Sequence, residues 1–172
     1  MGLEIRPATP DDAAAIQAIY AHYCLNGHAT FEEEAPSVAQ MAARVDAVVS
    51  KGLPWVVAEL DGVVRAYAYA GLFRERTAYR FTAEDTVYVD ANFCGRGLGR
   101  ATLDAVIEAC TAKGLHRLLA VIGGSDNAGS IALHKAFGFE HLGTMTEVGF
   151  KHGRWVDVVM MQLALPDAAP KL

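Results

Sequence analysis

The middle of the chain contains a glycine-rich segment with the residue types that bind phosphate, Gly95-Arg96-Gly97-Leu98-Gly99-Arg100. It follows an apolar run typical of a strand, Val87–Val89, and precedes a pattern typical of a helix from about Leu98 to Lys113. Glycines let backbone N–H groups approach an anion, and the first turn of a helix adds partial positive charge. Its spacing matches neither a Walker A loop nor the fingerprint of dinucleotide-binding folds. The segment therefore predicts a diphosphate site outside those two families.

The elements that must position this segment predict a mixed α+β domain with a central sheet. Strand patterns occur at residues 3–6, 55–60, 63–71, 87–89, 118–122, 139–150 and 154–165. Helical spacing with start and stop signals covers residues 10–26, 37–52, 98–113 and 127–138. Asp61-Gly62 is a hairpin turn signal between two of the strands. Because no repeat or linker divides these elements, we expect one domain over residues 1–165 and a C-terminal tail over 166–172.

The composition argues against several classes of protein. The 172 residues are 52% hydrophobic and 20% charged, which is ordinary for a globular domain. No apolar run reaches the 18 to 20 residues of a membrane span, and the N-terminus lacks a signal-peptide pattern, so we expect a soluble cytoplasmic protein. Three scattered cysteines fit a reducing compartment, and the histidines lack metal-ligand spacing. A net charge of −5 argues against a nucleic-acid partner.

A second motif makes the interpretation specific. A capped helix follows the strand at 118–122, with the pattern Asn-x-x-Ser-x-x-Leu-His-x-x-x-Gly-Phe over residues 127–139. The order of strand, Gly-x-Gly turn, helix, strand and this motif resembles the GNAT superfamily of acyl-CoA-dependent N-acetyltransferases. The motifs cover about residues 85–139, and the element order resembles the GNAT fold along nearly the whole chain. The resemblance implies a mostly antiparallel twisted sheet of about seven strands with helices on both faces.

The resemblance also implies where acetyl-CoA binds, and it implies no metal. The backbone of Tyr88 and Val89 would pair with the pantetheine arm, and Asn127 and Ser130 would contact the arm and the phosphates. The pyrophosphate would lie on Gly95, Arg96, Gly97, Leu98, Gly99 and Arg100. Cys94 stands where the family has a polar Gln or Arg. Because the backbone donors remain, we expect this departure to adjust affinity rather than abolish binding.

Two side chains are candidates for proton transfer. Glu84, at the start of the strand that ends at Val89, could remove a proton from the acceptor amine. Asp85 would be its rival, but strand alternation points it to the other face of the sheet. His134 stands where many family members have a Tyr that protonates the leaving thiolate. The sequence leaves open whether His134 is a general acid or only a contact of coenzyme A.

Three further segments narrow the resemblance to phosphinothricin and methionine sulfoximine acetyltransferases. They are Thr30-Phe31-Glu32, residues 69–84 and residues 148–157. The resemblance implies that Phe31, Arg76 and Tyr79 line the acceptor pocket with Glu84, and that Arg74 lies at a usually basic position. Arginine forks suit an acceptor that carries a carboxylate and a phosphinate or sulfoximine. The resemblance also implies a homodimer that uses the region near Phe150 and Trp155.

Other functions stay open at this point. The acceptor could be a polyamine, an aminoglycoside or a protein N-terminus, although an arginine-rich loop disfavours cationic acceptors. The domain could also be a non-catalytic acyl-CoA sensor, but the presence of a candidate base argues against this function. Herbicide resistance could be a side activity of an enzyme with another everyday role.

Overall fold

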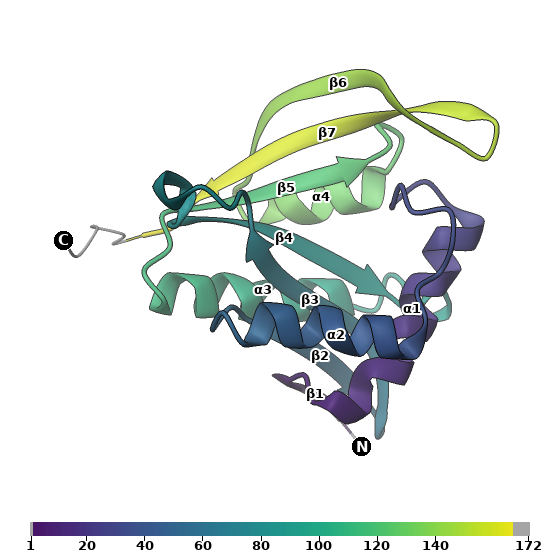
Figure 1. The fold of residues 1–172 in the computed structure, drawn as a ribbon, viewed down its shortest axis with the longest axis vertical. Helices are drawn as coiled ribbons and strands as arrows, with labels where there is room; N and C mark the ends of the chain where they lie inside the picture. The colour runs from purple at the N-terminus through teal and green to yellow at the C-terminus, as the bar shows by residue number, and fades with distance from the viewer. Residues whose placement is uncertain (1, 167–172) are drawn as a thin grey trace.

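Seven strands form one twisted sheet, shown in Figure 1, in the computed structural model, which describes residues 2–166. The strands are β1 (Leu3–Pro7), β2 (Trp55–Leu60), β3 (Val63–Leu72), β4 (Thr82–Val89), β5 (Arg117–Gly123), β6 (Glu140–Lys151) and β7 (Arg154–Ala164). Their spatial order is β1-β2-β3-β4-β5-β7-β6, and every neighbouring pair is antiparallel except β4 and β5. The predicted fold class, a mostly antiparallel seven-stranded sheet, is confirmed.

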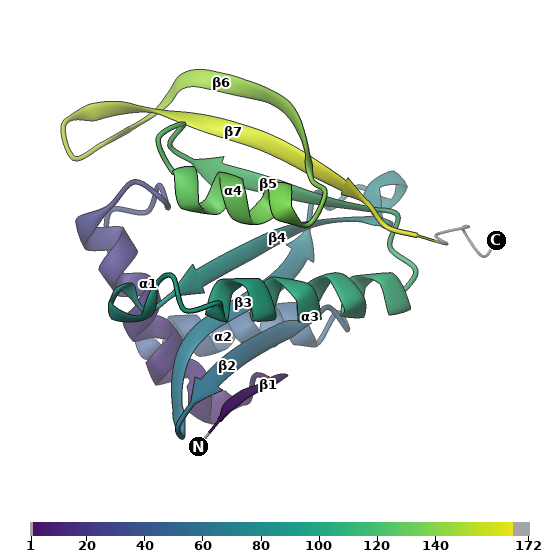
Figure 2. The same cartoon turned by 180° about the vertical axis from the view of Figure 1, so that it is seen from behind.

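Helices cover both faces of the sheet, as predicted. They are α1 (Ala13–Asn26), α2 (Val38–Val49), α3 (Leu98–Ala112) and α4 (Ala128–Ala136), with 3-10 turns at Pro10–Asp12, Thr77–Tyr79 and Ala91–Phe93. Helices α1 and α2 lie on one face, and the reverse view shows α3 and α4 on the other (Figures 1 and 2). The start signal of the helix predicted over residues 37–52 is a capping box: Ser37 Oγ accepts from Gln40 N, and Gln40 Oε1 accepts from Ser37 N.

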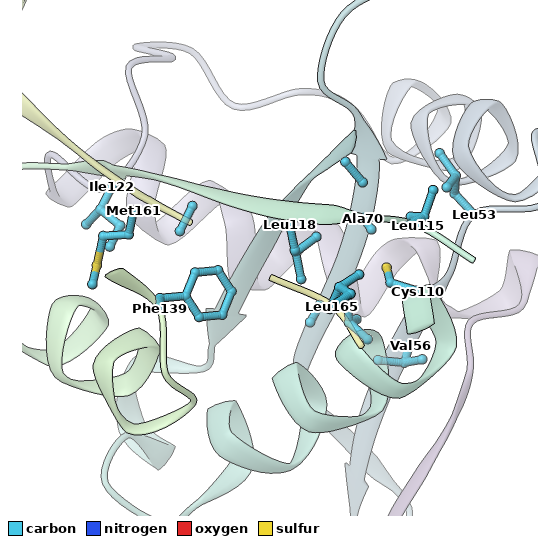
Figure 3. Close-up of a cluster of buried hydrophobic side chains, with 14 of the residues drawn as sticks. Leu53, Val56, Ala70, Cys110, Leu115, Leu118, Ile122, Phe139, Met161 and Leu165 are labelled. Carbon is cyan, nitrogen blue, oxygen red and sulfur yellow. The ribbon is translucent and has the colours of Figure 1, made fainter. Parts of the chain in front are cut away.

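The two faces of the sheet hold separate cores because successive strand residues point to opposite sides. Val56 packs with the α3 side and Val57 with the α1 and α2 side. Figure 3 shows the α3-side cluster, in which Leu118, Phe139 and Met161 are buried. The other cluster is aromatic, and in it Trp55 stacks on Tyr69 with ring centroids 4.0 Å apart.

The strands β4 and β5 are paired over only part of their length. Their parallel register runs from Thr82 opposite Arg117 to Asp85 opposite Ala120. Beyond Asp85 the two strands diverge, as Figure 1 shows, while β4 stays paired with β3 as far as Val89. The sheet is therefore split open between the second half of β4 and the end of β5.

Two general findings concern the described residues. No helix within residues 2–166 is long and apolar enough to cross a membrane. The same residues contain no group of three or more His, Cys, Asp or Glu side chains arranged to hold a metal ion. The predicted tail begins at Pro166, and residues 167–172 lie outside the described part.

Candidate active site

A cavity of about 750 Å³ occupies the split between β4 and β5. Its wall combines residues of β4 and β5, the loop after α1, the glycine-rich turn and one side of α4. Most of the residues predicted to form a site lie on this wall: Phe31, Glu84, Tyr88, Val89, Gly95, Gly97, Leu98, Gly99, Arg100, Asn127, Ser130 and His134. The fold therefore brings the two sequence motifs and the candidate base to one place.

The glycine-rich turn presents backbone rather than side chains to the cavity. Gly95 and Gly97 have φ angles of +75° and +83°, which favour glycine. Gly97 is the N-cap of α3, and it provides no side-chain capping hydrogen bond. The N–H groups of the first turn of α3 are thus left for an anion, which the helix dipole also favours. Gly99 lies so close to β4 that a Cβ there would be 3.3 Å from Val89 Cγ2.

The open edge of β4 offers further backbone groups. Asp90 N donates to Arg65 O near the start of β3, so the alternation of the strand turns Val89 toward the open edge. The Val89 carbonyl oxygen there accepts a hydrogen bond of 2.6 Å from the Tyr23 hydroxyl. Cys94 lies on the same wall, 3.9 Å from the Tyr23 hydroxyl oxygen and 3.7 Å from Asp90 O.

Helix α4 begins at the far side of the cavity with the predicted cap. Asn127 Oδ1 accepts a hydrogen bond from Ser130 N, and Asn127 Nδ2 donates to Gly123 O at the end of β5. These contacts fix the Asn127 side chain at the cavity wall, to which Ser130 also belongs. A ligand with a diphosphate at the start of α3 and an extended arm along the split fits this arrangement.

Glu84 lies at the point where the split begins, paired with Gly71 of β3 and Leu119 of β5. Its side chain is half-buried beside the aromatic cluster that includes Tyr69. Burial raises the pKa of Glu84, and the neighbouring charge of Asp85 raises it further. A carboxylate whose proton affinity is increased in this way is a better general base for an amine.

Asp85 points to the opposite face, as strand alternation predicts, and there it meets His134. Asp85 Oδ2 lies 2.8 Å from His134 Nε2, and the exposed fractions of the two side chains are 1% and 4%. The other ring nitrogen, Nδ1, lies 2.7 Å from the carbonyl oxygen of Ser130. Both nitrogens of His134 are therefore engaged inside the protein.

The loop after α1 forms the wall near Glu84 and is held from several sides. Lys151 Nζ, buried at the end of β6, donates to Thr30 O at 2.8 Å and to Tyr23 O at 3.1 Å. The Tyr20 hydroxyl bonds both Thr30 Oγ1 and Glu32 Oε1, and Glu32 in turn forms an ion pair with Arg44 of α2. This network fixes the backbone on which Phe31 is presented to the cavity.

Comparisons with known proteins agree with this geometry. Residues 5–160 match the family described as "Acetyltransferase (GNAT) domain". This chain belongs to the GNAT acetyltransferase family. It is 46% identical to a phosphinothricin N-acetyltransferase from Alcaligenes faecalis over 161 residues, which cover 94% of this chain and 82% of the relative. It is 39% identical to an L-methionine sulfoximine/L-methionine sulfone acetyltransferase from Salmonella typhimurium over 169 residues, which cover 98% of each.

A solved structure of a relative extends this agreement to three dimensions. The GNAT phosphinothricin acetyltransferase from Sinorhizobium meliloti, solved in complex with AcCoA, superimposes with a TM-score of 0.92. The two share 46% sequence identity, and the match covers 96% of this chain and 89% of the other. The predicted family is confirmed, and this GNAT chain is an acetyltransferase.

Some predicted site residues of this acetyltransferase lie away from the cavity wall. Arg74 stacks on Phe73 with its guanidinium 4.9 Å from the ring centroid, and Tyr79 packs edge-on against the same ring. Arg96 lies over Phe93 instead of lining the cavity. Arg76 is exposed at the start of the 3-10 turn that contains Tyr79. Their proposed contacts with ligands stay predictions.

Sequence reasoning missed the partner of His134. Alternation indicated which face Asp85 occupies, but not that α4 would bring an imidazole to that face. The residues are 49 positions apart, so the contact depends on how α4 packs across the sheet. The role of Lys151 was missed for the same reason, because its partners Tyr23 and Thr30 lie more than 120 residues away.

Proposed function

We propose that this chain transfers the acetyl group of acetyl-CoA to the α-amino group of a small amino-acid-like substrate of the phosphinothricin or methionine sulfoximine type. The observation that carries the proposal is the position of Glu84. A half-buried carboxylate with a raised pKa stands where the split between β4 and β5 begins. Relatives with nearly complete coverage carry names of the same substrate class.

Acetyl-CoA is the acetyl donor, and the cavity provides suitable groups for each part of it. The uncapped first turn of α3, with Gly95, Gly97 and Gly99, would hold the pyrophosphate. The open edge of β4 at Val89 would pair with the pantetheine arm, and the start of α4 would contact it from the other side. Tyr88, whose backbone the same alternation turns toward β3, would contact the arm only as part of the cavity wall. Bound there, the donor supplies a thioester whose carbonyl carbon accepts the amine.

Glu84 would act as the general base for a direct transfer. An α-amino group has a pKa of about 8, so a fraction of it is already neutral at pH 7. Glu84 takes the remaining amine proton, directly or through one water, while the new N–C bond forms and the C–S bond breaks. The Val89 N–H, on the open edge of β4, would stabilise the charge that develops on the carbonyl oxygen.

His134 would serve on the other side of the sheet as the acid for the leaving sulfur. The acceptor would lie on the Glu84 side, against Phe31. The segment between β3 and β4 carries Arg74 and Arg76 and leads directly to Glu84, which supports their proposed role in binding the acidic groups of the acceptor.

A cytoplasmic location and a homodimer complete the proposal. All three cysteines are free and Cys94 is exposed, which suits a reducing compartment. On the β6–β7 hairpin, Phe150 and Trp155 are exposed large apolar side chains that contact each other edge-on. A second copy of the chain is the occupant we propose for this surface.

An acceptor panel tests the proposed activity. Release of free thiol from acetyl-CoA is measured with phosphinothricin, methionine sulfoximine, methionine sulfone, spermidine, an aminoglycoside and a peptide N-terminus. We expect kcat/KM to be highest for one of the three amino-acid analogues. Preferred turnover of spermidine, the aminoglycoside or the peptide would overturn the acceptor class. Tight binding of acetyl-CoA with no turnover of any acceptor would favour a sensor.

A further inference from the structure

Asp85 and His134 form a buried pair with a restricted set of protonation states. The hydrogen bond of 2.7 Å between His134 Nδ1 and Ser130 O requires a hydrogen on Nδ1, because a carbonyl oxygen can only accept. The Nε2 atom then faces Asp85 Oδ2 at 2.8 Å. Two bare acceptors at that distance in a dry site would repel each other, so one proton lies between Nε2 and Oδ2.

The surroundings keep that proton on the pair. Ala70 of β3 and Ala120 of β5 flank Asp85 in the sheet, and the Phe139 ring packs edge-on against His134 at 4.9 Å. None of these groups can replace a lost proton or compensate a charge. The second carboxylate oxygen, Asp85 Oδ1, is buried without a hydrogen-bond partner among residues 2–166.

Two titratable groups act on the pair from neighbouring positions. Glu84 precedes Asp85 on β4 and points to the other face, and its charge interacts with that of Asp85. Cys110 faces the pair from α3, and burial raises the pKa of its thiol to about 12, so it stays neutral. Neither group supplies positive charge that could stabilise a bare Asp85 carboxylate in place of His134.

The directions of the pKa shifts agree with this arrangement. Burial raises the pKa of Asp85 more than the hydrogen bond from His134 lowers it. Burial opposes a charge on His134, but the hydrogen bond and the charge of Asp85 outweigh it and raise the pKa of His134. Both directions mean that the pair retains its shared proton at neutral pH.

We propose that Asp85 is a positioning residue, which fixes the His134 ring and keeps on it the proton that the leaving sulfur of the acetyl donor takes. This inference rests on the proposed acetyl transfer. A thiol has an ordinary pKa of about 8.5, and general acid catalysis is most efficient when the pKa of the acid lies near the operating pH. Asp85 raises the pKa of His134, whereas a buried histidine without a counter-charge would be neutral at pH 7.

The proton balance of one turnover is complete with these groups. As the N–C bond forms and the C–S bond breaks, Glu84 takes the amine proton. The Asp85–His134 pair, both members of which line the cavity, gives the proton between Nε2 and Oδ2 to sulfur. Solvent then removes the proton from Glu84 and returns one to the Asp85–His134 pair. The products are the acetylated amine and the free thiol, and no other reactant is needed.

A titration of the wild-type chain by NMR tests the pair without any turnover. The ring nitrogens of His134 are followed by nitrogen-15 chemical shifts from pH 6 to 9, with the signals assigned by their loss in His134→Gln. We expect a hydrogen on Nδ1 throughout and no titration step near pH 6.5, because the shared proton is lost only at higher pH. A ring that titrates near pH 6.5, as an unpaired histidine does, would overturn the inference.

The variant Asp85→Asn separates position from protonation. An asparagine amide can still donate to Nε2, so the ring stays in place but cannot keep the extra proton. We expect an unprotonated Nε2 over the whole range and a kcat about 100-fold lower, with the Kd for acetyl-CoA changed less than about twofold. Unchanged His134 shifts in Asp85→Asn would overturn the inference.

Asp12→Asn is the matched control, because Asp12 is also a buried carboxylate in an ion pair but is not part of the cavity wall. A loss of kcat in Asp85→Asn no larger than in Asp12→Asn would reduce Asp85 to a structural residue and overturn the inference. If no acceptor in the panel is acetylated, the proposed function fails, while the NMR titrations still decide whether the pair holds its proton.

Discussion

Two adjacent carboxylates on β4 have different environments because the strand turns them to opposite faces. Glu84 is half-buried at the start of the split, without an ion-pair partner among the described residues. Asp85 is almost fully buried and bound to His134. Because their environments differ in this way, Glu84 is suited to act as a base and Asp85 to act as the partner of an acid, His134.

At this residue scale, Glu84→Gln should lower kcat by about 10² to 10⁴-fold, because the amide keeps the shape but cannot accept the amine proton. The Kd for acetyl-CoA, measured by calorimetry, should stay the same. Because the raised pKa of Glu84 moves the acidic limb of the pH–rate profile upward, the wild-type rate should fall as pH drops through that pKa, and the variant should lose this limb. Glu75→Gln, on the exposed loop before β4, is the control, and near-wild-type turnover in Glu84→Gln would remove Glu84 as base.

The residues that touch the cavity were predictable mainly where backbone chemistry marks them. Gly97 and Asn127 are identified by turn and cap preferences that act over a few positions. Glu84 could be predicted as a site residue from its place at the start of a strand. The Asp85–His134 contact was not, because side-chain partners across the sheet depend on helix packing that local preferences do not encode.

At the scale of elements, two glycines define the position of the loop after α1. A Cβ at Gly123 of β5 would lie 2.5 Å from His28 O, and one at Gly149 of β6 would lie 2.6 Å from Phe31 Cζ. The loop therefore fits closely between the end of β5 and β6. Because β4 and β5 have separated there, the loop closes one side of the cavity against Tyr88, whose hydroxyl donates to Ala29 O.

Gly149→Ala should displace the Phe31 ring and change acceptor binding. Phe31 is partly exposed, so its ring can move outward with little loss of stability. An aromatic contact contributes about 0.5 to 1.5 kcal/mol, so the KM for the acceptor should rise by about 2 to 10-fold with the Kd for acetyl-CoA unchanged. Steady-state kinetics measure both.

Gly143→Ala is the control for this change, since it lies on the same strand and a Cβ there meets nothing within 4 Å. In a Phe31→Ala background, Gly149→Ala should add no further effect, because the ring that it displaces is already absent. A full additional loss of acceptor affinity in that background would contradict the role assigned to Gly149.

The elements themselves were largely predictable, and their irregularities were not. Helix α2 starts one residue after the predicted cap at Ser37, and the turns at Asp61-Gly62 and His152-Gly153 join the expected strands. The register shift between Met145 and Gly149, with Glu147 at a φ of +53°, left no clear sequence signal. The shift ends at Gly149, which packs against Phe31 in a contact between segments far apart in the sequence.

At the scale of the whole molecule, the β6–β7 hairpin leaves an apolar surface exposed. Phe150 and Trp155 are 57% and 60% exposed, and Val148 and Met145 add to the same strand pair. If a second copy covers this surface, light scattering should give twice the chain mass, and Trp155→Glu should give a monomer. Val63→Glu, at an exposed apolar position in β3, should leave the mass unchanged. A monomeric wild type at micromolar concentration would contradict the proposed dimer.

The opposite edge of the sheet should set the response of the whole fold to acid. Arg6 of β1 bonds both Asp12, before α1, and Glu59 of β2, each at 2.8 Å. The hydrogen bond from Arg6 lowers the pKa of Asp12 from 3.8 to about 2. A carboxyl group whose pKa is lower in the folded than in the unfolded chain stabilises the fold at pH values above its unfolded pKa. This contribution, about 2 kcal/mol, is therefore present at pH 5 and is lost as pH falls from about 4 to 2.

Asp12→Asn should therefore lower the free energy of urea unfolding at pH 6 and flatten its fall below pH 4. Asp11 is exposed, so Asp11→Asn should change neither. An equally steep acid limb in Asp12→Asn would show that other carboxylates control acid unfolding.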